Sequence, residues 1–214
     1  MAAKRIASAV SGFVALAAML VGASCGASRP MSYYTLDSSG APARAPAPGS
    51  GNGDAPLPVT IVVGRVSAAP LYLDSPIVYS TSDVEMGTYQ YHRWAEVPTQ
   101  MLETMLTRSL RDTGKFRSVA RLGSGATGDY VLRGHLYALE EVDSPSLGAR
   151  FSLELDLFDP KTRTVVWTQT YDREEPVSRK SVSAVVETLH QETTAGIGQL
   201  TANLVSYLSN LTSR

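Results

Sequence analysis

Three histidines are the residues best suited to acid–base or metal chemistry, and they are scattered along the chain. His92, His135 and His190 lie in three different segments, whereas zinc ligands usually come in closely spaced pairs. Arg133, His135 and Tyr137 alternate on one side of a strand-like segment, and no serine or cysteine nucleophile motif accompanies them. We therefore interpret the histidines as polar surface residues and predict neither a catalytic base nor a metal site.

An acidic group of Glu140, Glu141 and Asp143 closes the same segment. A pair of carboxylates could hydrolyse a glycosidic bond. Neighbouring residues of a strand point to opposite faces, so Glu140 and Glu141 cannot face each other across a substrate. We expect a solvated strand end here.

Two other segments have motif-like patterns. The glycines of GSGATG, residues 123–128, are spaced like those of a phosphate-binding loop. The Gly-Lys-Ser/Thr ending and the following helix are missing, so we predict a turn. GTYQYHRW, residues 87–94, is aromatic and slightly basic, and it could stack bases or face a partner or the core. Its residues of types enriched at protein interfaces are Tyr89, Tyr91, Arg93 and Trp94.

The composition excludes several classes of protein. Apolar residues make up 43% of the 214 residues and the formal net charge is −1, which argues against disorder of the whole chain. Nucleic acid is excluded as the main partner because it requires a basic surface. A single cysteine excludes a disulfide framework and a cysteine-rich zinc site. With no catalytic set and no cofactor motif, we predict a protein that is not an enzyme.

The N-terminus has the pattern of an export signal. Lys4 and Arg5 precede a continuous apolar run at 6–21, and small residues follow at 22–24. The alternative is a signal anchor that stays in the membrane. The run is shorter than the ~20 apolar residues of a usual spanning helix, so we predict a signal peptide at 1–24 that is cleaved.

The only cysteine, Cys25, follows this segment directly. Small residues before a cysteine resemble a bacterial lipobox, in which the thiol is acylated with chains such as palmitate and becomes the mature N-terminus. Ala23 and Ser24 match, whereas Gly22 stands where leucine is usual. Soluble secretion with an incidental cysteine is the alternative. We predict lipidation at Cys25 and a tether at 25–31. The residue after the cysteine is Gly26, whereas an aspartate there would favour retention at the inner membrane, so the sequence favours the outer membrane.

Segments rich in β-branched and alternating apolar residues predict a sheet. The expected strands cover 32–37, 59–66, 77–83, 86–96, 116–120, 130–143, 149–159 and 164–172. The last three should form an antiparallel meander, with Ser152, Glu154 and Asp156 on its polar face. Residues 38–58 are almost entirely Ser, Gly, Ala and Pro, which predicts a flexible insertion behind an edge strand.

Two segments have helical periodicity. Apolar residues recur on one face of 97–113, where Pro98 lies in the first turn and Gly114 follows as a stop signal. A longer amphipathic pattern covers 180–211, and its Gly196 and Gly198 would permit close packing on a sheet. The predicted fold is therefore α/β, a single domain at 32–214 with a mixed, largely antiparallel sheet packed by these two helices.

The order of several motifs resembles the ABC-type transport auxiliary lipoprotein family, of the PqiC and YmbA type. YYTL follows the lipobox-like cysteine, and YLDSPIVY, YQYHRWAEVP, GKFRSVA, LRGHLYALE and LELDLFD then appear in turn. The resemblance implies a non-enzymatic lipoprotein on the periplasmic side of the envelope. It would work with an ABC transporter containing mammalian-cell-entry (MCE) domains that moves lipids or other hydrophobic molecules and supports membrane integrity.

The resemblance also implies a docking role at the membrane. The residues on the matching motifs are Tyr72, Leu73, Tyr91, Arg93 and Trp94, and they would either bind an MCE-domain subunit or pack inside the fold. A homo-oligomeric ring is compatible with this interpretation. The rivals are a lipoprotein that binds a lipid in its own cavity, which requires a pocket lined by Leu and Phe, and a periplasmic hydrolase, which requires converging nucleophile and base residues.

Overall fold

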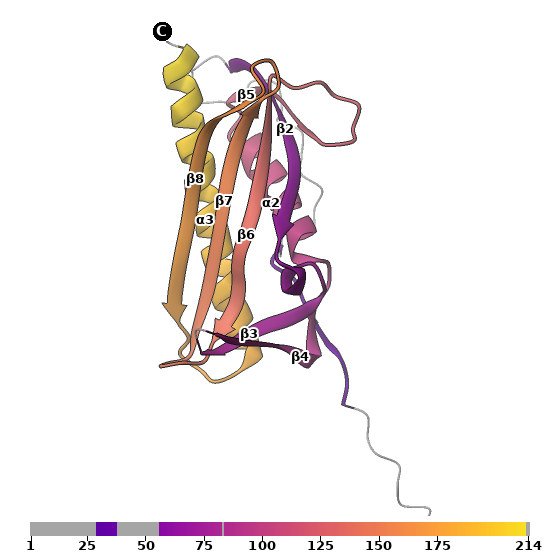
Figure 1. Ribbon diagram of the computed structural model, residues 1–214, viewed down its shortest axis with the longest axis vertical. Helices are drawn as coiled ribbons and strands as arrows, with labels where there is room; N and C mark the ends of the chain where they lie inside the picture. The colour runs from indigo at the N-terminus through magenta and orange to yellow at the C-terminus, as the bar shows by residue number, and fades with distance from the viewer. Residues whose placement is uncertain (1–28, 38–55, 83, 213–214) are drawn as a thin grey trace, which may run out of the picture. The chain divides into compact units, whose positions relative to one another are not determined.

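A computed structural model describes residues 29–37, 56–82 and 84–212 (Figure 1). The predicted signal peptide, Cys25 and most of the predicted insertion lie outside these residues. The described helices and strands all belong to one compact unit, Met31–Arg214.

Eight strands form one mixed sheet, and two α-helices and a short 3-10 helix complete the described fold. In chain order the elements are β1 (Ser32–Tyr34), β2 (Leu57–Ala68), η1 (Pro70–Tyr72), β3 (Pro76–Ser82), β4 (Glu85–Trp94), α2 (Pro98–Asp112), β5 (Phe116–Arg121), β6 (Tyr130–Val142), β7 (Gly148–Asp159), β8 (Thr164–Pro176) and α3 (Val182–Thr212). The predicted α/β class and both predicted helices are confirmed.

The strand β6 organises the sheet because it is paired on both edges. On one edge it pairs antiparallel with β7, which pairs antiparallel with β8, so the predicted meander is confirmed. On the other edge β6 pairs in parallel with β2 as far as Leu136 and then with β3 from Glu140 onward. The strands β2 and β3 thus follow one another along a single edge of β6.

The sheet divides into two branches where η1 interrupts that edge. The upper branch in Figure 1 is β2 and β5, which pair in parallel. The lower branch is β3, β4 and β1, in which β3 and β4 form an antiparallel hairpin and β1 adds in parallel to the end of β4. The sheet is mixed, as predicted: four of its seven pairings are parallel, and the two antiparallel pairings of the meander are the longest.

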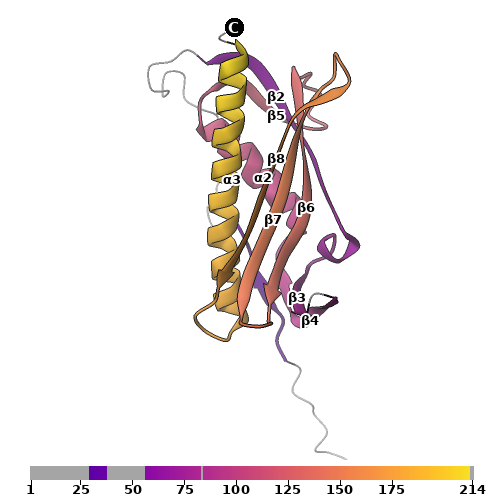
Figure 2. The same cartoon turned by 60° about the vertical axis from the view of Figure 1, so that its left-hand side comes forward.

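Both α-helices cover the same face of the sheet, and the other face of the meander is open (Figure 2). α3 contacts β7 and β8, α2 contacts β2 and β5, and the helices contact each other. The core side of β7 carries the predicted alternation of buried Phe151, Leu153, Leu155 and Leu157. On the opposite side Glu154 and Asp156 are half-buried, whereas Ser152 is buried.

Several strand boundaries differ from the expected ones. β2 begins at Leu57, inside the segment expected to be a flexible insertion, because Leu57 and Phe116 pair across the two strands. β8 continues to Pro176 because β7 supplies pairing partners as far as Gly148. A strand continues where a neighbouring strand supplies hydrogen-bond partners, and that neighbour cannot be identified from the local sequence.

The two glycines of α3 have different environments. A Cβ atom added to Gly196 would lie 2.7 Å from the Tyr171 ring and 3.0 Å from the Phe151 ring, so only glycine lets the helix approach β7 and β8 this closely. A Cβ atom at Gly198 would meet nothing within 4 Å. Close packing is therefore confirmed for Gly196 and not for Gly198.

This difference makes a matched pair of substitutions. We expect Gly196→Ala to lower the free energy of unfolding by about 1–3 kcal/mol, because the added methyl group overpacks the helix–sheet contact. Gly198→Ala should instead raise it by up to about 1 kcal/mol through helix propensity alone. Urea denaturation of both variants measures the difference, and equal effects would contradict the packing role of Gly196.

Candidate functional site

The acidic end of β6 is buried, which corrects the expectation of a solvated strand end. Glu140 is 6% exposed and Glu141 is 7% exposed. The Tyr72 hydroxyl donates to Glu140 Oε2 at 2.6 Å, and the Tyr89 hydroxyl donates to both oxygens of Glu141 at 2.9 and 3.0 Å. The two carboxyl groups therefore hold two different elements, η1 and β4, against the end of β6.

Burial is the main reason that the pKa values of these four groups are raised. It raises the pKa of Glu140 and of Glu141 above the usual range, and the tyrosine hydrogen bonds oppose that effect without cancelling it. The pKa of each tyrosine is also raised, first by burial and then by its carboxyl partner. Glu140 and Glu141 belong to opposite faces of one strand, so they do not form a facing catalytic pair.

The five residues predicted to dock a partner do not form one surface. Trp94 is 1% exposed and Tyr72 is 3% exposed, so both are core residues and offer no surface to a partner in this conformation. Leu73 is exposed at the end of η1. Tyr91 and Arg93 are half-buried on β4, and the Arg93 guanidinium donates to the Ser75 hydroxyl at 3.1 Å.

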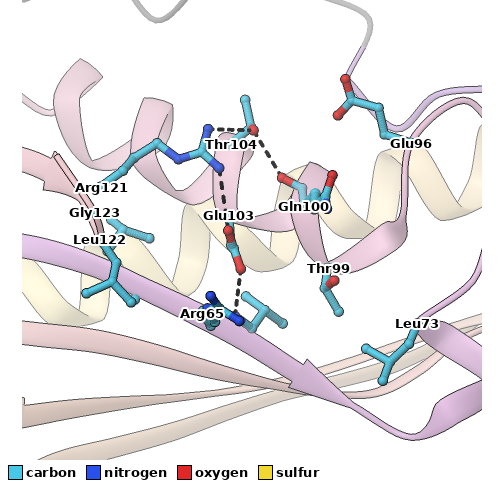
Figure 3. A pocket seen from close by; sticks show the side chains of 13 residues that line it. Arg65, Leu73, Glu96, Thr99, Gln100, Glu103, Thr104, Arg121, Leu122 and Gly123 are labelled. Atoms are coloured by element: carbon cyan, nitrogen blue, oxygen red, sulfur yellow. Dashed lines mark hydrogen bonds and ion pairs between the residues drawn. The ribbon is translucent and has the colours of Figure 1, made fainter.

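Leu73 contributes to a groove of about 820 Å³ between the second half of β2 and the start of α2 (Figure 3). The groove exists because β5 pairs with β2 only as far as Val63, which leaves the following β2 residues paired with β6 alone. The Val66 amide that faces the groove donates to Glu103 Oε1 at 3.0 Å. Glu103 thus takes the place of the missing strand and protects this edge.

The groove is polar and carries both signs of charge. Arg121 donates to the second oxygen of Glu103 at 3.4 Å, and Arg65, Glu96 and Gln100 also line the groove. Glu103 was not predicted from the sequence. The available signal was its position between the buried Leu102 and Leu106, on a helix face that should be largely apolar.

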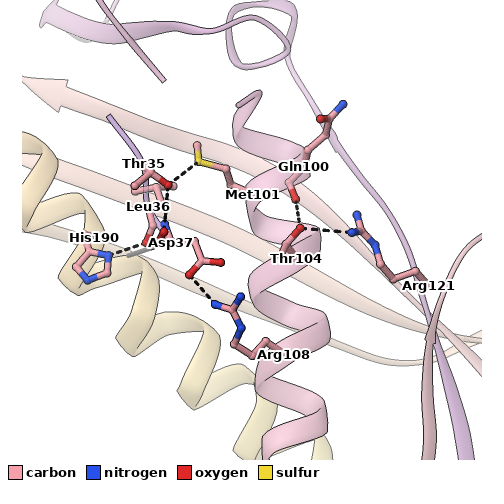
Figure 4. A network of polar contacts seen from close by, with 9 residues as sticks. All are labelled: Thr35, Leu36, Asp37, Gln100, Met101, Thr104, Arg108, Arg121 and His190. Carbon is pink, nitrogen blue, oxygen red and sulfur yellow. Dashed lines mark hydrogen bonds and ion pairs between the residues drawn. The ribbon is translucent and has the colours of Figure 1, made fainter. Parts of the chain in front are cut away.

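Each histidine contacts a different part of the fold. His92 Nδ1 and the Tyr34 hydroxyl are hydrogen-bonded at 3.0 Å, which joins β1 to β4. His190 Nδ1 donates to the Leu36 carbonyl at 2.6 Å, which joins α3 to the segment after β1 (Figure 4). In the described residues no group of His, Cys, Asp and Glu is arranged to hold a metal ion.

His135 contacts Ser67, a contact that could not be predicted from the sequence because the two residues lie on different strands. The Ser67 hydroxyl lies 2.8 Å from His135 Nδ1 and 3.1 Å from the Gly134 carbonyl oxygen. Glu154 is the pairing partner of His135 across β7, but within the described chain no hydrogen bond joins them. The pair therefore lacks the third group that orients a catalytic base.

A cleft of about 430 Å³ lies between α2 and α3 (Figure 4 shows the contacts at its edge). Leu36, Met105 and Ile197 line it together with His190 and an ion pair between Asp37 and Arg108. A lipid-binding lipoprotein is expected to have a pocket lined by Leu and Phe, and this cleft is not such a pocket because charged groups interrupt its apolar lining.

A sequence model of the family described as ABC-type transport auxiliary lipoprotein component matches residues 34–202. The chain belongs to this family. The match extends from β1 to the last turns of α3, so it covers the whole described fold apart from its two ends. The predicted resemblance is confirmed.

Solved structures support the fold of this auxiliary lipoprotein. Protein XCC0632 from Xanthomonas campestris, of family DUF330, is similar with a TM-score of 0.70 and 23% identity, covering 85% of this chain and 98% of its own. A second, uncharacterized protein is similar with a TM-score of 0.61 and 17% identity, covering 84% and 99%. No protein of curated function matches the sequence.

The family is an auxiliary lipoprotein component and not a known enzyme. Its description associates it with an ABC-type transport system, and its lipoprotein character suggests association with the cell envelope. Within the part of the chain that the structure describes, neither α2 nor α3 combines the length and the apolar character that crossing a bilayer requires.

The buried carboxyl group of Glu140 predicts a pH-dependent stability. Because its folded-state pKa lies above the unfolded value, its stabilising contribution is complete below about pH 4.5 and is lost as the pH rises through the folded-state pKa. Glu140→Gln cannot ionise and retains an acceptor for Tyr72. The free energy of unfolding of this variant, relative to the wild type, should therefore increase as the pH rises from about 4.5 to neutral.

Denaturant titrations across this pH range measure the effect. Glu154→Gln, on the open face of the sheet, is the matched control and should track the wild type. Parallel curves for Glu140→Gln and the wild type at every pH would contradict the role assigned to burial.

Proposed function

We propose that this chain is a lipid-anchored accessory protein on the periplasmic side of the cell envelope. It docks an ABC transport assembly that contains an MCE-domain subunit and moves lipids or other hydrophobic molecules. The observation that carries the proposal is the family match over residues 34–202, which begins nine residues after the single cysteine at position 25. Export and acylation at Cys25 would place the folded unit next to a bilayer.

The chemistry of the described residues is compatible with a binding role. The buried carboxyl groups are held by tyrosines, the Ser67–His135 contact has no orienting third group, and the large groove beside α2 is lined by charged and polar side chains. These features suit contact with another protein. An outer-membrane location and a homo-oligomeric ring are parts of the proposal that the anchor and the family suggest.

Anchoring increases the local concentration of the accessory protein at the membrane. Once the transport assembly spans the envelope, docking becomes effectively intramolecular, and avidity can exceed the solution affinity by about 10²-fold. A weak contact surface on the folded unit would then be sufficient.

Removal of the thiol tests the anchor. We expect Cys25→Ser, unlike the wild type, to be released from membranes by a high-salt wash and to lower capture of the MCE-domain subunit from membranes by about 10²-fold, while a Ser28→Ala control behaves like the wild type. Mass spectrometry of the mature wild-type N-terminus should find an acylated cysteine. An unmodified thiol there, or Cys25→Ser retained on membranes after the high-salt wash to the same extent as the wild type, would disprove the anchor.

Substitution of the surface-accessible docking residues tests the docking role. The double variant Tyr91→Ala, Arg93→Ala should bind the MCE-domain subunit about tenfold more weakly than the wild type, because tyrosine and arginine often dominate interface energies. Leu73→Ala tests the groove in the same way. Thr168→Ala, on the open face of β8, is the control, and docking that tolerates every substitution would place the contact elsewhere.

A further inference from the structure

Four of the ten exposed large apolar residues of the described fold lie at one end: Met31, Tyr33, Val84 and Met86. Leu71 and Leu73, on η1 and directly after it, and Tyr137, in the middle of β6, lie away from this end. Of the remaining three, Val165 and Leu211 lie at the start of β8 and near the end of α3, where the opposite end of the unit is found (Figures 1 and 2).

The register of the sheet shows how the hairpin reaches this end. Met86 pairs with Ser80, Ser80 with Val142, Val142 with Gly148, and Gly148 with Pro176. This row crosses five strands. The β3–β4 turn, the β6–β7 turn and the β8–α3 link all lie on the same side of this row. The β3–β4 turn therefore lies at the same end as the turn between β6 and β7 and the link between β8 and α3.

The chain enters the fold at this same end. Both views place the start of β1 low on the unit, below the meander and beside the β3–β4 hairpin (Figures 1 and 2). Met31 directly precedes β1 and is 41% exposed, and Tyr33 within it is 66% exposed. At the hairpin turn Val84 is 93% exposed and Met86 is 44% exposed. Tyr33 pairs with Arg93, seven positions along β4 from Met86, so Met31 and Tyr33 lie about 23 Å from the residues at the hairpin turn. We call the two groups together the basal patch.

Covalent geometry limits how far this end can lie from an anchored cysteine. Six residue-to-residue steps separate Cys25 from Met31, which allows at most about 22 Å in any conformation. β7, with its 12 residues, is about 40 Å long. An acyl anchor at Cys25 therefore keeps the basal end near the bilayer. The inverted orientation, with the opposite end on the bilayer, would place the start of β1 farther from the bilayer than the tether can reach.

The side chains of the basal end suit a lipid surface. Tyrosine and methionine can insert into the region between headgroups and acyl chains, where tyrosine retains a hydrogen bond to water. Arg179 and Lys180 are exposed in the link between β8 and α3, and Lys180 Nζ lies 3.6 Å from Asp143 Oδ1 of the β6–β7 turn. Basic residues at this position favour anionic headgroups.

We propose that the basal patch of Met31, Tyr33, Val84 and Met86 rests on the membrane surface and orients the folded unit on its lipid anchor. The inference rests on the proposed acylation of Cys25, and it adds a second, non-covalent contact between this protein and the bilayer. That contact holds the meander upright, so the groove beside α2 and the open sheet face remain available to protein partners.

Vesicle binding of the unanchored protein tests the contact separately from the anchor. The probe is a vesicle of phosphatidylethanolamine and phosphatidylglycerol at low salt, and the protein is the chain from residue 25 onward with Cys25→Ser. It contains the compact unit Met31–Arg214 entire. We expect measurable flotation with vesicles, and about tenfold weaker binding for Tyr33→Asp, Met86→Asp, because each substitution removes an apolar contact with lipid.

The matched control is Val165→Asp, Leu211→Asp, at sites of 45% and 44% exposure on the opposite end. It should bind vesicles like the parent. Equal binding by the basal and control variants overturns the proposal. Loss of transporter capture by the basal variant with undiminished vesicle binding also overturns it, because the patch would then be a protein-docking surface.

Fluorescence quenching tests the orientation in the acylated full chain. Tyr33→Trp and Leu211→Trp are compared in vesicles containing brominated lipid, after subtraction of the signal from Trp94 and Trp167. Quenching of Tyr33→Trp alone is the expected result. Membrane-bound protein in which neither added tryptophan is quenched, or both are quenched equally, overturns the basal contact while leaving the anchor at Cys25 intact. An unmodified Cys25 would instead refute the anchor, and the vesicle assay would still decide the basal contact.

Discussion

A buried carboxyl group at the end of β6 is the contact on which the lower part of this fold depends. One edge of β6 is shared by β2 and β3 in succession, and the chain between them leaves the sheet through η1. The Tyr72 hydroxyl attaches η1 to the sheet by donating a hydrogen bond to Glu140. Without this bond the buried carboxyl group would lose its hydroxyl donor, and a buried polar group without a hydrogen bond is costly. The same bond fixes the point at which the sheet divides.

The second carboxyl group extends the same constraint to β4. Glu141 accepts from Tyr89 on the hairpin, while Ser80 of β3 donates from its hydroxyl to the Glu141 carbonyl oxygen. The lower branch is thus attached by backbone pairing and by two tyrosine–glutamate bonds on opposite faces of β6. An arrangement of this kind fixes the orientation of β4, and with it the half-buried Tyr91 and Arg93 that we propose for docking.

Local sequence was sufficient for the parts of the fold that local interactions determine. The helices and the meander were predictable because their periodicity, prolines and turn residues act within a few positions of each other. The roles of Glu140, Tyr72 and Trp94 were not. Glu140 and Tyr72 are 68 positions apart, and an acidic strand end looks solvated until a distant donor is known. Trp94 belongs to a residue type that is enriched both in interfaces and in cores, so its type alone could not decide between them. Glu103 was missed for the same reason, because its partner is a strand edge that exists only where β5 stops.

The two ends of the unit are suited to different surroundings. The helices cover one face of the sheet and leave the other open, so protein contacts have the sides of the unit available to them. The basal end has the chain entry and four of the ten exposed large apolar side chains of the described fold. A short tether alone would let the unit rotate freely about Met31. Docking would then have to restrict that rotation, and the lost entropy would weaken the complex. A lipid contact at the basal end removes part of that freedom before the partner arrives, because the orientation is already restricted when docking begins. Anchor and orientation would then act together: the acyl chains supply proximity, and the basal patch supplies the direction in which the groove and the docking residues face.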